Sequence, residues 1–432
     1  MATRPSTSRT RWVIVVLAGL GTAINYLDRA TLSVAEKLVR EDLALGRDDM
    51  GLAMSAFFWT YAVFQLPSGW FVDKVGARVA YTVAAVWWSG FTMLTGLARG
   101  FGSLFTFRFL LGAGEAPAYP CNAKVVSQWF PKSERALATG IFDSGARAGS
   151  VVAIPLVTAS VAYLGWRLSF ALIGAVGLLW ALGWWLYYRT PREHSRVSDE
   201  EIAHIEKGQI GVEPNPAAAD ADADATSLSW KDLFRYRTVW GMMLGFFCLN
   251  FVAYFFVTWF PTYLIEERGF DNLKLGFFGM IPGLFAMVTG WAGGLFSDTL
   301  LKRGYSLTKA RKIPLVSGML MSSCIALAVI VPEAWQAVAL LSLSFGSITF
   351  AAASVWSLPA DVAPHPKYVA SIGGIQNFAA NFAGIGISIL VGYLYEATGT
   401  FLVPLLTTGA VAFVGAFSYL VVIREVAPLK TR

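Results

Sequence analysis

The sequence predicts an all-α polytopic membrane protein, with twelve transmembrane helices in two pseudo-symmetric bundles of six. Of its 432 residues, 56% are hydrophobic and only 14% are charged, whereas an ordinary soluble domain has about 25% charged residues. Apolar stretches of about 20 residues recur along nearly the whole chain, and each could cross a hydrocarbon core of roughly 30 Å as a helix. So much apolar surface needs lipid as its solvent.

The apolar stretches give the expected spans in order. They lie near residues 12–34, 50–72, 79–98, 103–123, 136–160, 166–188, 238–264, 275–297, 312–331, 335–358, 368–393 and 400–423. The first span follows three arginines, as a signal peptide would, but its apolar run continues into the polar "NYLDR" without a small-residue cleavage site. We therefore expect a retained first helix.

Basic residues alternate between the loops. About 24 Lys and Arg fall in the N-terminus, the even-to-odd loops and the C-terminus, against about 7 in the opposite loops. The positive-inside rule then places both termini in the cytoplasm of a multi-pass protein in the cell's inner (plasma) membrane. This distribution accounts for the net charge of +6 and argues against a nucleic-acid partner.

Cysteines and histidines give no sign of a metal or cofactor. The three cysteines lie inside predicted spans, which favours packed small hydrophobes over a disulfide framework, and the histidines have no metal-ligand spacing. No cluster of catalytic residues stands out, so we expect a protein that is not an enzyme. Tryptophans near span ends, such as Trp184 and Trp185, indicate anchors at the membrane interface.

One long polar segment divides the chain. Residues 189–237 include the low-complexity stretch "EPNPAAADADADA", which has little to bury. We expect an N-terminal six-helix bundle at 1–188, a cytoplasmic central loop at 189–237, and a C-terminal six-helix bundle with a cytoplasmic tail at 238–432.

The two halves look related. Gly69 and Asp73 are four residues apart where the second span ends, and Gly294 and Asp298 repeat this spacing where the eighth ends. Parallel repeats with a site near the bilayer midplane at their interface are a common design of secondary transporters.

These features resemble a known superfamily. The twelve spans, the central loop and the "G-x-x-x-D-x-x-G-x-R" loop resemble the major facilitator superfamily over essentially the whole chain. Within it, "NYLDRATLSVA" in the first span and "RFLLGAGEAPAYP" in the fourth resemble the anion:cation symporter family. That family includes hexuronate, aldonate, aldarate and phthalate carriers and the vesicular glutamate and sialic acid carriers.

The resemblance implies the major facilitator fold and proton-coupled symport of a small organic anion such as a sugar acid, by alternating access of a monomer. An exchanger or facilitator of organic anions without net proton coupling stays open, as does a carrier of phthalate-like aromatic carboxylates. A membrane transferase is a remote alternative, since it would need a catalytic cluster at the interface.

Six ionisable residues fall inside predicted spans: Asp28, Arg29, Arg108, Glu115, Asp143 and Arg147. A central charge costs roughly 2.5 to 3.5 kcal/mol on the insertion scale, so these residues need partners or a watery cavity. Arg108 and Glu115 are seven residues apart and share a helical face, which suits either an anion site with a protonatable carboxylate or a structural ion pair. Asp28 and Arg29 are sequence neighbours whose side chains point about 100° apart on a helix, so they cannot pair face to face and each needs another partner.

The family resemblance implies roles for several of these residues. Arg29 would contact the substrate carboxylate, and Asp28 and Glu115 would be the proton-linked carboxylates. The remaining substrate-binding candidates, including Gln65 one turn from Tyr61 and neutral polar or aromatic groups of the second half, are Tyr26, Tyr61, Gln65, Arg108, Trp356, Gln376 and Asn377.

Two further groups complete the predicted site. Arg147 either binds a second acidic group of a dianion or forms an intrahelical pair with Asp143, four residues before it. The resemblance implies that the cytoplasmic loop after the second span latches the inward-closed bundle. A cluster of basic residues that only sets the topology would explain Arg78 equally well, but not the duplicated Asp298. The gating candidates are Gly69, Asp73, Arg78 and Asp298.

Overall fold

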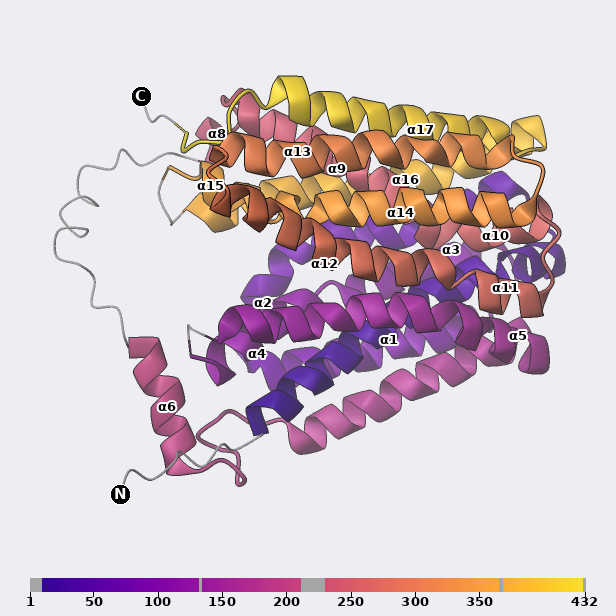
Figure 1. Cartoon of the computed structure of the whole chain (residues 1–432). Coiled ribbons are helices and arrows are strands. Elements are labelled where there is room, and N and C mark those ends of the chain that lie inside the picture. Colours follow the sequence, from indigo (N-terminus) through magenta and orange to yellow (C-terminus); the bar gives the residue numbers. More distant parts are fainter. Residues whose placement is uncertain (1–9, 132–133, 211–229, 365–367, 430–432) are drawn as a thin grey trace.

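The computed structural model describes residues 10–131, 134–210, 230–364 and 368–429 (Figure 1). Every regular element within these ranges is a helix, which confirms the predicted all-α class. Eight helical stretches of the described chain are long and apolar enough to cross a membrane.

The N-terminal half contains five helices in the order of the predicted spans. They are α1 (Thr10–Asp42), α2 (Arg47–Thr95), α3 (Phe101–Glu115), α4 (Ala118–Trp129) and α5 (Arg135–Tyr187). Two predicted spans fall on α2 and two on α5, and each of these helices is interrupted where a glycine takes a positive φ. Gly76 has φ 81° and Gly165 has φ 74°, a conformation that side chains with a Cβ rarely adopt. The glycines thus turn each chain segment back across the bundle.

The rest of the chain continues the same helical pattern. A helix of the central segment, α6 (Asp199–Ile210), and the short α8 (Trp230–Leu233) precede the second half. The second half comprises α9 (Arg237–Thr258), α10 (Phe260–Glu266), α11 (Asn272–Phe278), α12 (Ile281–Lys302), α13 (Leu307–Ser322), η1 (Ser323–Val329), α14 (Ala334–Val355), α15 (Leu358–Val362), α16 (Val369–Thr398), α17 (Leu402–Phe417) and η3 (Ser418–Val422).

The helices run side by side between two ends of the molecule (Figure 1). At one end, which we call the terminal end, lie the start of α1, α6, α8 and α15. The opposite end carries α10 and α11, and we call it the loop end. The loop between α1 and α2 belongs to the loop end, because Arg40 and Arg47 contact Glu266 of α10.

Hydrophobic packing differs between the two halves. One large buried cluster joins the halves, because it contains Leu32 and Ile154 together with Phe256 and Tyr263. A second cluster draws all its buried members from residues 14–188, the N-terminal half. Apolar burial is the main force that holds such surfaces together, so the halves are joined mainly through the first cluster.

Glycines allow the closest approach between the halves. A Cβ added to Gly51 of α2 would lie 2.5 Å from the backbone oxygen of Ser388, and one added to Gly392 of α16 would lie 2.6 Å from that of Arg47. Contacts that short do not occur between real Cβ atoms and backbone, so α2 and α16 meet backbone to backbone at the loop end.

The two tryptophans expected at the interface differ. Trp185 is exposed, with the Arg78 guanidinium 4.0 Å from its ring centroid. Trp184 is fully buried and stacks between Trp180 and Tyr188, so the prediction of an interfacial anchor is wrong for Trp184. Adjacent helical residues point about 100° apart, and here only one of the two faces outward.

Candidate functional site

A buried ion pair lies at the centre of the N-terminal half. Arg29 of α1 donates from Nε to Oε2 of Glu115, the last residue of α3, at 2.8 Å. The Arg29 side chain is 7% exposed and that of Glu115 is 0% exposed. Burial of two charges is costly unless they pair well, so neither could lose its partner without a replacement.

Aromatic rings surround the Arg29 guanidinium. Its central carbon lies 5.1 Å from the ring centroid of Tyr26, 4.7 Å from that of Phe57 and 4.7 Å from that of Tyr61. Tyr61 stacks on Phe57 with 5.3 Å between centroids. These rings stabilise the cation by cation–π attraction and restrict its position.

Two more buried charges adjoin this pair. Arg108 is 4% exposed, lies 5.4 Å from the Phe57 ring centroid, and lines a small cavity together with Arg29. Asp28 is 1% exposed, and among the described residues neither of its carboxylate oxygens has a hydrogen-bond partner. A buried carboxyl without a hydrogen-bond partner is much less costly as a neutral acid than as an anion.

A cavity of about 270 Å³ separates the two halves beside this cluster. Tyr26 and Ser150 line it from the N-terminal half, and Asn250, Thr349 and Trp356 line it from the other. Its volume approaches the lower end of the range of about 300–1,000 Å³ for small-molecule sites. Trp356, predicted to bind substrate, is 62% exposed and packs edge-on against the neighbouring Phe246.

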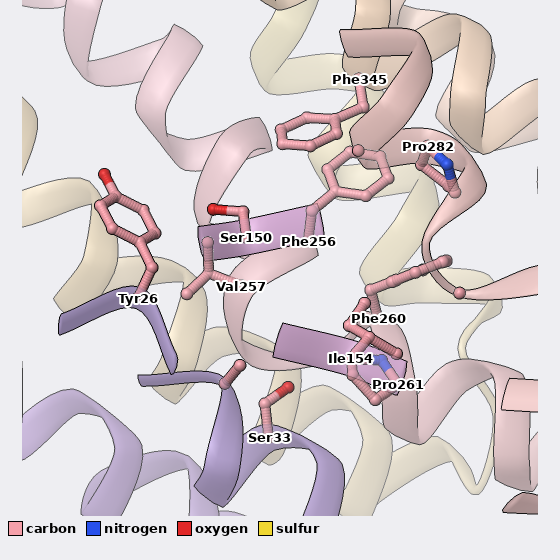
Figure 2. A pocket seen from close by; sticks show the side chains of 13 residues that line it. Tyr26, Ser33, Ser150, Ile154, Phe256, Val257, Phe260, Pro261, Pro282 and Phe345 are labelled. Carbon is pink, nitrogen blue, oxygen red and sulfur yellow. The ribbon is translucent and has the colours of Figure 1, made fainter. Parts of the chain in front are cut away.

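An apolar constriction lies between this cavity and the loop end (Figure 2). A smaller cavity of about 50 Å³ shares Tyr26 and Ser150 with the main one and continues to Ser33. Phe256 and Phe345 stack at 4.4 Å between ring centroids on its wall. Figure 2 shows these two rings side by side, with Tyr26 on the other side of the space.

The predicted amides separate into two environments. Gln65 Oε1 of α2 accepts from Nδ2 of Asn377 at 3.3 Å and from Nδ2 of Asn381 at 3.1 Å, both on α16. The three form a polar bridge between the halves. Gln376 instead is buried and donates from Nε2 to the backbone oxygen of Val355 at 3.4 Å.

The gating candidates of the N-terminal half lie apart from the cavity. Asp73 accepts from Lys124 Nζ at 2.7 Å, and Arg78 donates to the backbone oxygen of Trp185. Gly69 has open space where a Cβ would project.

The remaining candidates lie elsewhere. In the second half, Arg311 lies 3.9 Å from Asp298 and 2.7 Å from Asp361. The side chains of Asp143 and Arg147 lie outside the part of the chain whose side chains the structure describes.

The structure contains several polar contacts that the sequence analysis does not predict. Asn381 is one, because only the fold places it beside Gln65. Glu36 and Arg40 form an i,i+4 ion pair that the sequence spacing could have revealed. The further partner of Arg40, Glu266, is more than 200 residues away along the chain, so no local pattern points to it.

Comparison with known proteins agrees with this architecture. A model of the Major Facilitator Superfamily matches residues 18–389. A bacterial homologue of the human lysosomal transporter Spinster, crystallised in an inward-facing and occupied conformation, has the same fold with a TM-score of 0.78. It is 17% identical, and the match covers 97% of this chain and 98% of that one.

Curated relatives match over nearly their whole length. A probable galactarate/D-glucarate transporter of Bacillus subtilis (strain 168) is 38% identical over 97% of this chain and 92% of its own. A D-galactonate transporter of Escherichia coli O6:H1 is 37% identical over 97% and 96%. A probable sulfoacetate transporter of Cupriavidus necator is 36% identical over 95% and 94%.

The two packed halves, the cavity between them and these relatives define an integral membrane transporter rather than an enzyme. The chain belongs to the Major Facilitator Superfamily, as its sequence motifs predicted.

Proposed function

We propose that this transporter is a proton-coupled symporter of sugar acids such as galactarate, glucarate or galactonate. The names of its relatives support the substrate class. The observation that carries the coupling is the buried contact between Arg29 and Glu115. Arg29 also lies 5.1 Å from the ring centroid of Tyr26, which lines the main cavity, so the same arginine can serve a protonatable carboxylate and an incoming anion.

Competition for Arg29 supplies the mechanism. The planar guanidinium offers a substrate carboxylate a bidentate contact that is stronger than a single charged hydrogen bond. When the substrate takes Arg29, Glu115 loses its direct cationic partner while remaining buried. A buried carboxylate without its cation takes up a proton. Anion and proton therefore strengthen each other's binding, as linkage requires.

Asp28 and Arg108 complete the electrostatic site. Arg108 lines, together with Arg29, a cavity of about 10 Å³, so it would contact a bound anion only after this space widens. Asp28, whose oxygens meet no hydrogen-bond partner among the described residues, is the second candidate for a transported proton. On the other side of the cavity, Asn250, Thr349 and Trp356 offer hydroxyl-recognising and stacking groups to a sugar chain.

The same proposal includes the topology. With both termini cytoplasmic, the terminal end faces the cytoplasm and the loop end faces the outside of the inner membrane. The halves pack together through the large apolar cluster and the loop-end glycines, which suits an inward-facing state of the two-bundle carrier. The protomer carries both halves of the cavity and can work as a monomer.

Transport by the purified protein in lipid vesicles tests the proposal. We expect an imposed pH gradient, acidic outside, to drive accumulation of labelled galactarate or galactonate above its external concentration, and a protonophore to abolish it. Counterflow of substrate without gradient-driven accumulation would favour an exchanger. Transport of sulfoacetate or phthalate in place of every sugar acid would overturn the substrate class.

A further inference from the structure

The loop end holds a second cluster of buried charges, none of which lines the substrate cavity. Five side chains form it, and we call it the loop-end clasp: Glu36 and Arg40 of α1, Arg47 of α2, Glu266 of α10 and Tyr395 of α16. The first three belong to one half and the last two to the other.

Glu266 is the centre of the clasp, because three donors from three helices converge on its carboxylate. Arg40 Nη2 donates to Oε1, and Oε2 accepts from Arg47 Nη2 at 2.9 Å and from Tyr395 OH at 2.6 Å. The Glu266 side chain is 8% exposed and that of Arg40 is 14% exposed. Hydrogen bonds to charged groups that are this well buried are among the strong ones.

The other members extend the clasp on both sides. Arg40 also donates from Nε to Oε1 of Glu36 at 2.9 Å, and Oε2 of Glu36 accepts from Thr262 of α10 at 3.2 Å. Arg47 lies 4.2 Å from the ring centroid of Tyr395. Two arginines thus balance two buried glutamates, and most of these contacts join one half to the other.

We infer that the loop-end clasp is the gate that holds the loop end of this carrier shut. Glu266 is its positioning residue, because it holds Arg40 and Arg47 in place. The halves must part here before solute can enter the cavity from that side, and parting separates Glu266 from Arg40 and Arg47. Arg40 then keeps Glu36 beside it, since the two share a helix. In the closed state, loss of the Glu266 charge leaves Arg40 and Arg47 with the buried Glu36 and with Glu396, which is 47% exposed and 3.9 Å from Arg47, so it favours opening.

Glu266 keeps its charge over a wide pH range. Burial raises the pKa of Glu266, but the hydrogen bonds from Tyr395 and Arg47 and the charges of Arg40 and Arg47 outweigh burial and hold that pKa below its ordinary value of 4.5. The gate goes beyond the proposed function. It rests on the proposed orientation of the chain in the membrane and does not depend on which substrate is carried.

Thiol labelling measures the gate directly. Ser33 lies beyond the clasp toward the cavity, is 2% exposed, and donates from Oγ to the backbone oxygen of Thr258 across the halves at 2.6 Å. The test protein carries Ser33→Cys as its single cysteine after alanine replaces Cys121, Cys248 and Cys324. A membrane-impermeant maleimide is added to right-side-out vesicles without substrate, and the labelling rate is measured.

We expect Glu266→Gln to raise the labelling rate by about tenfold or more over the parent, since loss of a buried charged partner shifts an equilibrium at least that far. The matched control is Glu267→Gln, whose carboxylate, within the described part of the chain, accepts one hydrogen bond, from the backbone nitrogen of Phe401 at 3.4 Å; its rate should equal that of the parent. Arg47→Gln and Tyr395→Phe should also raise the rate. If a thermal-unfolding assay shows that Glu266→Gln does not fold, the labelling rates of these two variants decide the test instead.

Equal rates in Glu266→Gln and Glu267→Gln would overturn the gate. An increase seen only in inside-out vesicles would keep the gate and overturn the proposed topology. Because labelling requires neither substrate nor a proton gradient, failure of the proposed sugar-acid symport would leave this result unchanged, and the two proposals can fail separately.

Discussion

The Glu115→Gln variant gives the most informative perturbation of the site. Glutamine keeps the size and hydrogen-bonding shape of a protonated glutamic acid but cannot release a proton. In the wild-type carrier at alkaline pH, a substrate carboxylate must displace Glu115 from its 2.8 Å contact with Arg29. In the variant that competitor is neutral. We therefore expect tighter substrate binding at alkaline pH and similar binding at acidic pH.

The contact sets the size of this effect. A hydrogen bond to a charged group contributes about 1.5–3 kcal/mol, so relief from displacing it should lower the Kd of the substrate by roughly 10- to 100-fold at alkaline pH. In the wild type, uptake of one linked proton makes the Kd rise by up to about tenfold per pH unit once Glu115 is ionised. In Glu115→Gln that slope should disappear.

Two assays separate binding from coupling. Isothermal titration across a pH series gives the Kd values, and vesicle transport compares exchange between preloaded vesicles with uptake driven by a proton gradient. Glu115→Gln should exchange but not accumulate, because the empty carrier must shed a proton to complete its cycle while a loaded carrier need not. As a control, Glu134→Gln alters a carboxylate that pairs with Arg11 at the terminal end and should keep both activities. Accumulation by Glu115→Gln against the substrate gradient would show that Glu115 is not the coupling carboxylate and make Asp28 the main candidate.

Three further predictions concern substrate recognition. Arg29→Lys and Arg108→Lys should each lose most uptake, because a lysine lacks the planar fork, and normal affinity in Arg29→Lys would remove Arg29 from the substrate site. Arg147→Gln should weaken binding of the dianion galactarate far more than that of galactonate in competition assays; equal losses with poor expression would instead indicate a structural pair. Gln65→Leu removes the acceptor shared by two amides of α16 and should raise the KM for sugar acids several-fold. The KM for a substrate without hydroxyl groups, such as sulfoacetate, should not rise in the same variant.

Much of the fold follows from the sequence because its signals are local. The apolar stretches predict helices that the structure contains, and glycines with positive φ explain why two pairs of predicted spans form one interrupted helix each. Whether a given side of a helix faces the protein interior or the outside is harder to predict. Trp184 and Trp185 have the same position at a span end, yet tertiary packing buries one and exposes the other.

The candidate site was predictable as a set of residues but not as a set of contacts. A charge inside a span is costly wherever it occurs, so Arg29 and Glu115 stand out without a structure. Their pairing joins α1 to α3 across 86 positions of the chain, and no spacing within one helix reveals it. The same holds for Gln65 and Asn381, and for Glu266 with its two arginines, which look like ordinary loop charges until the fold brings them together.

Proton uptake on substrate binding measures the competition between substrate and Glu115 for Arg29. The purified carrier is mixed with saturating galactarate in a weakly buffered detergent solution at a pH where Glu115 is ionised, and a pH indicator records the protons removed from solution. Competition for Arg29 predicts uptake of about one proton per bound anion in the wild type and none in Glu115→Gln. Binding of the anion by the wild type without any proton uptake across the pH series would contradict the account.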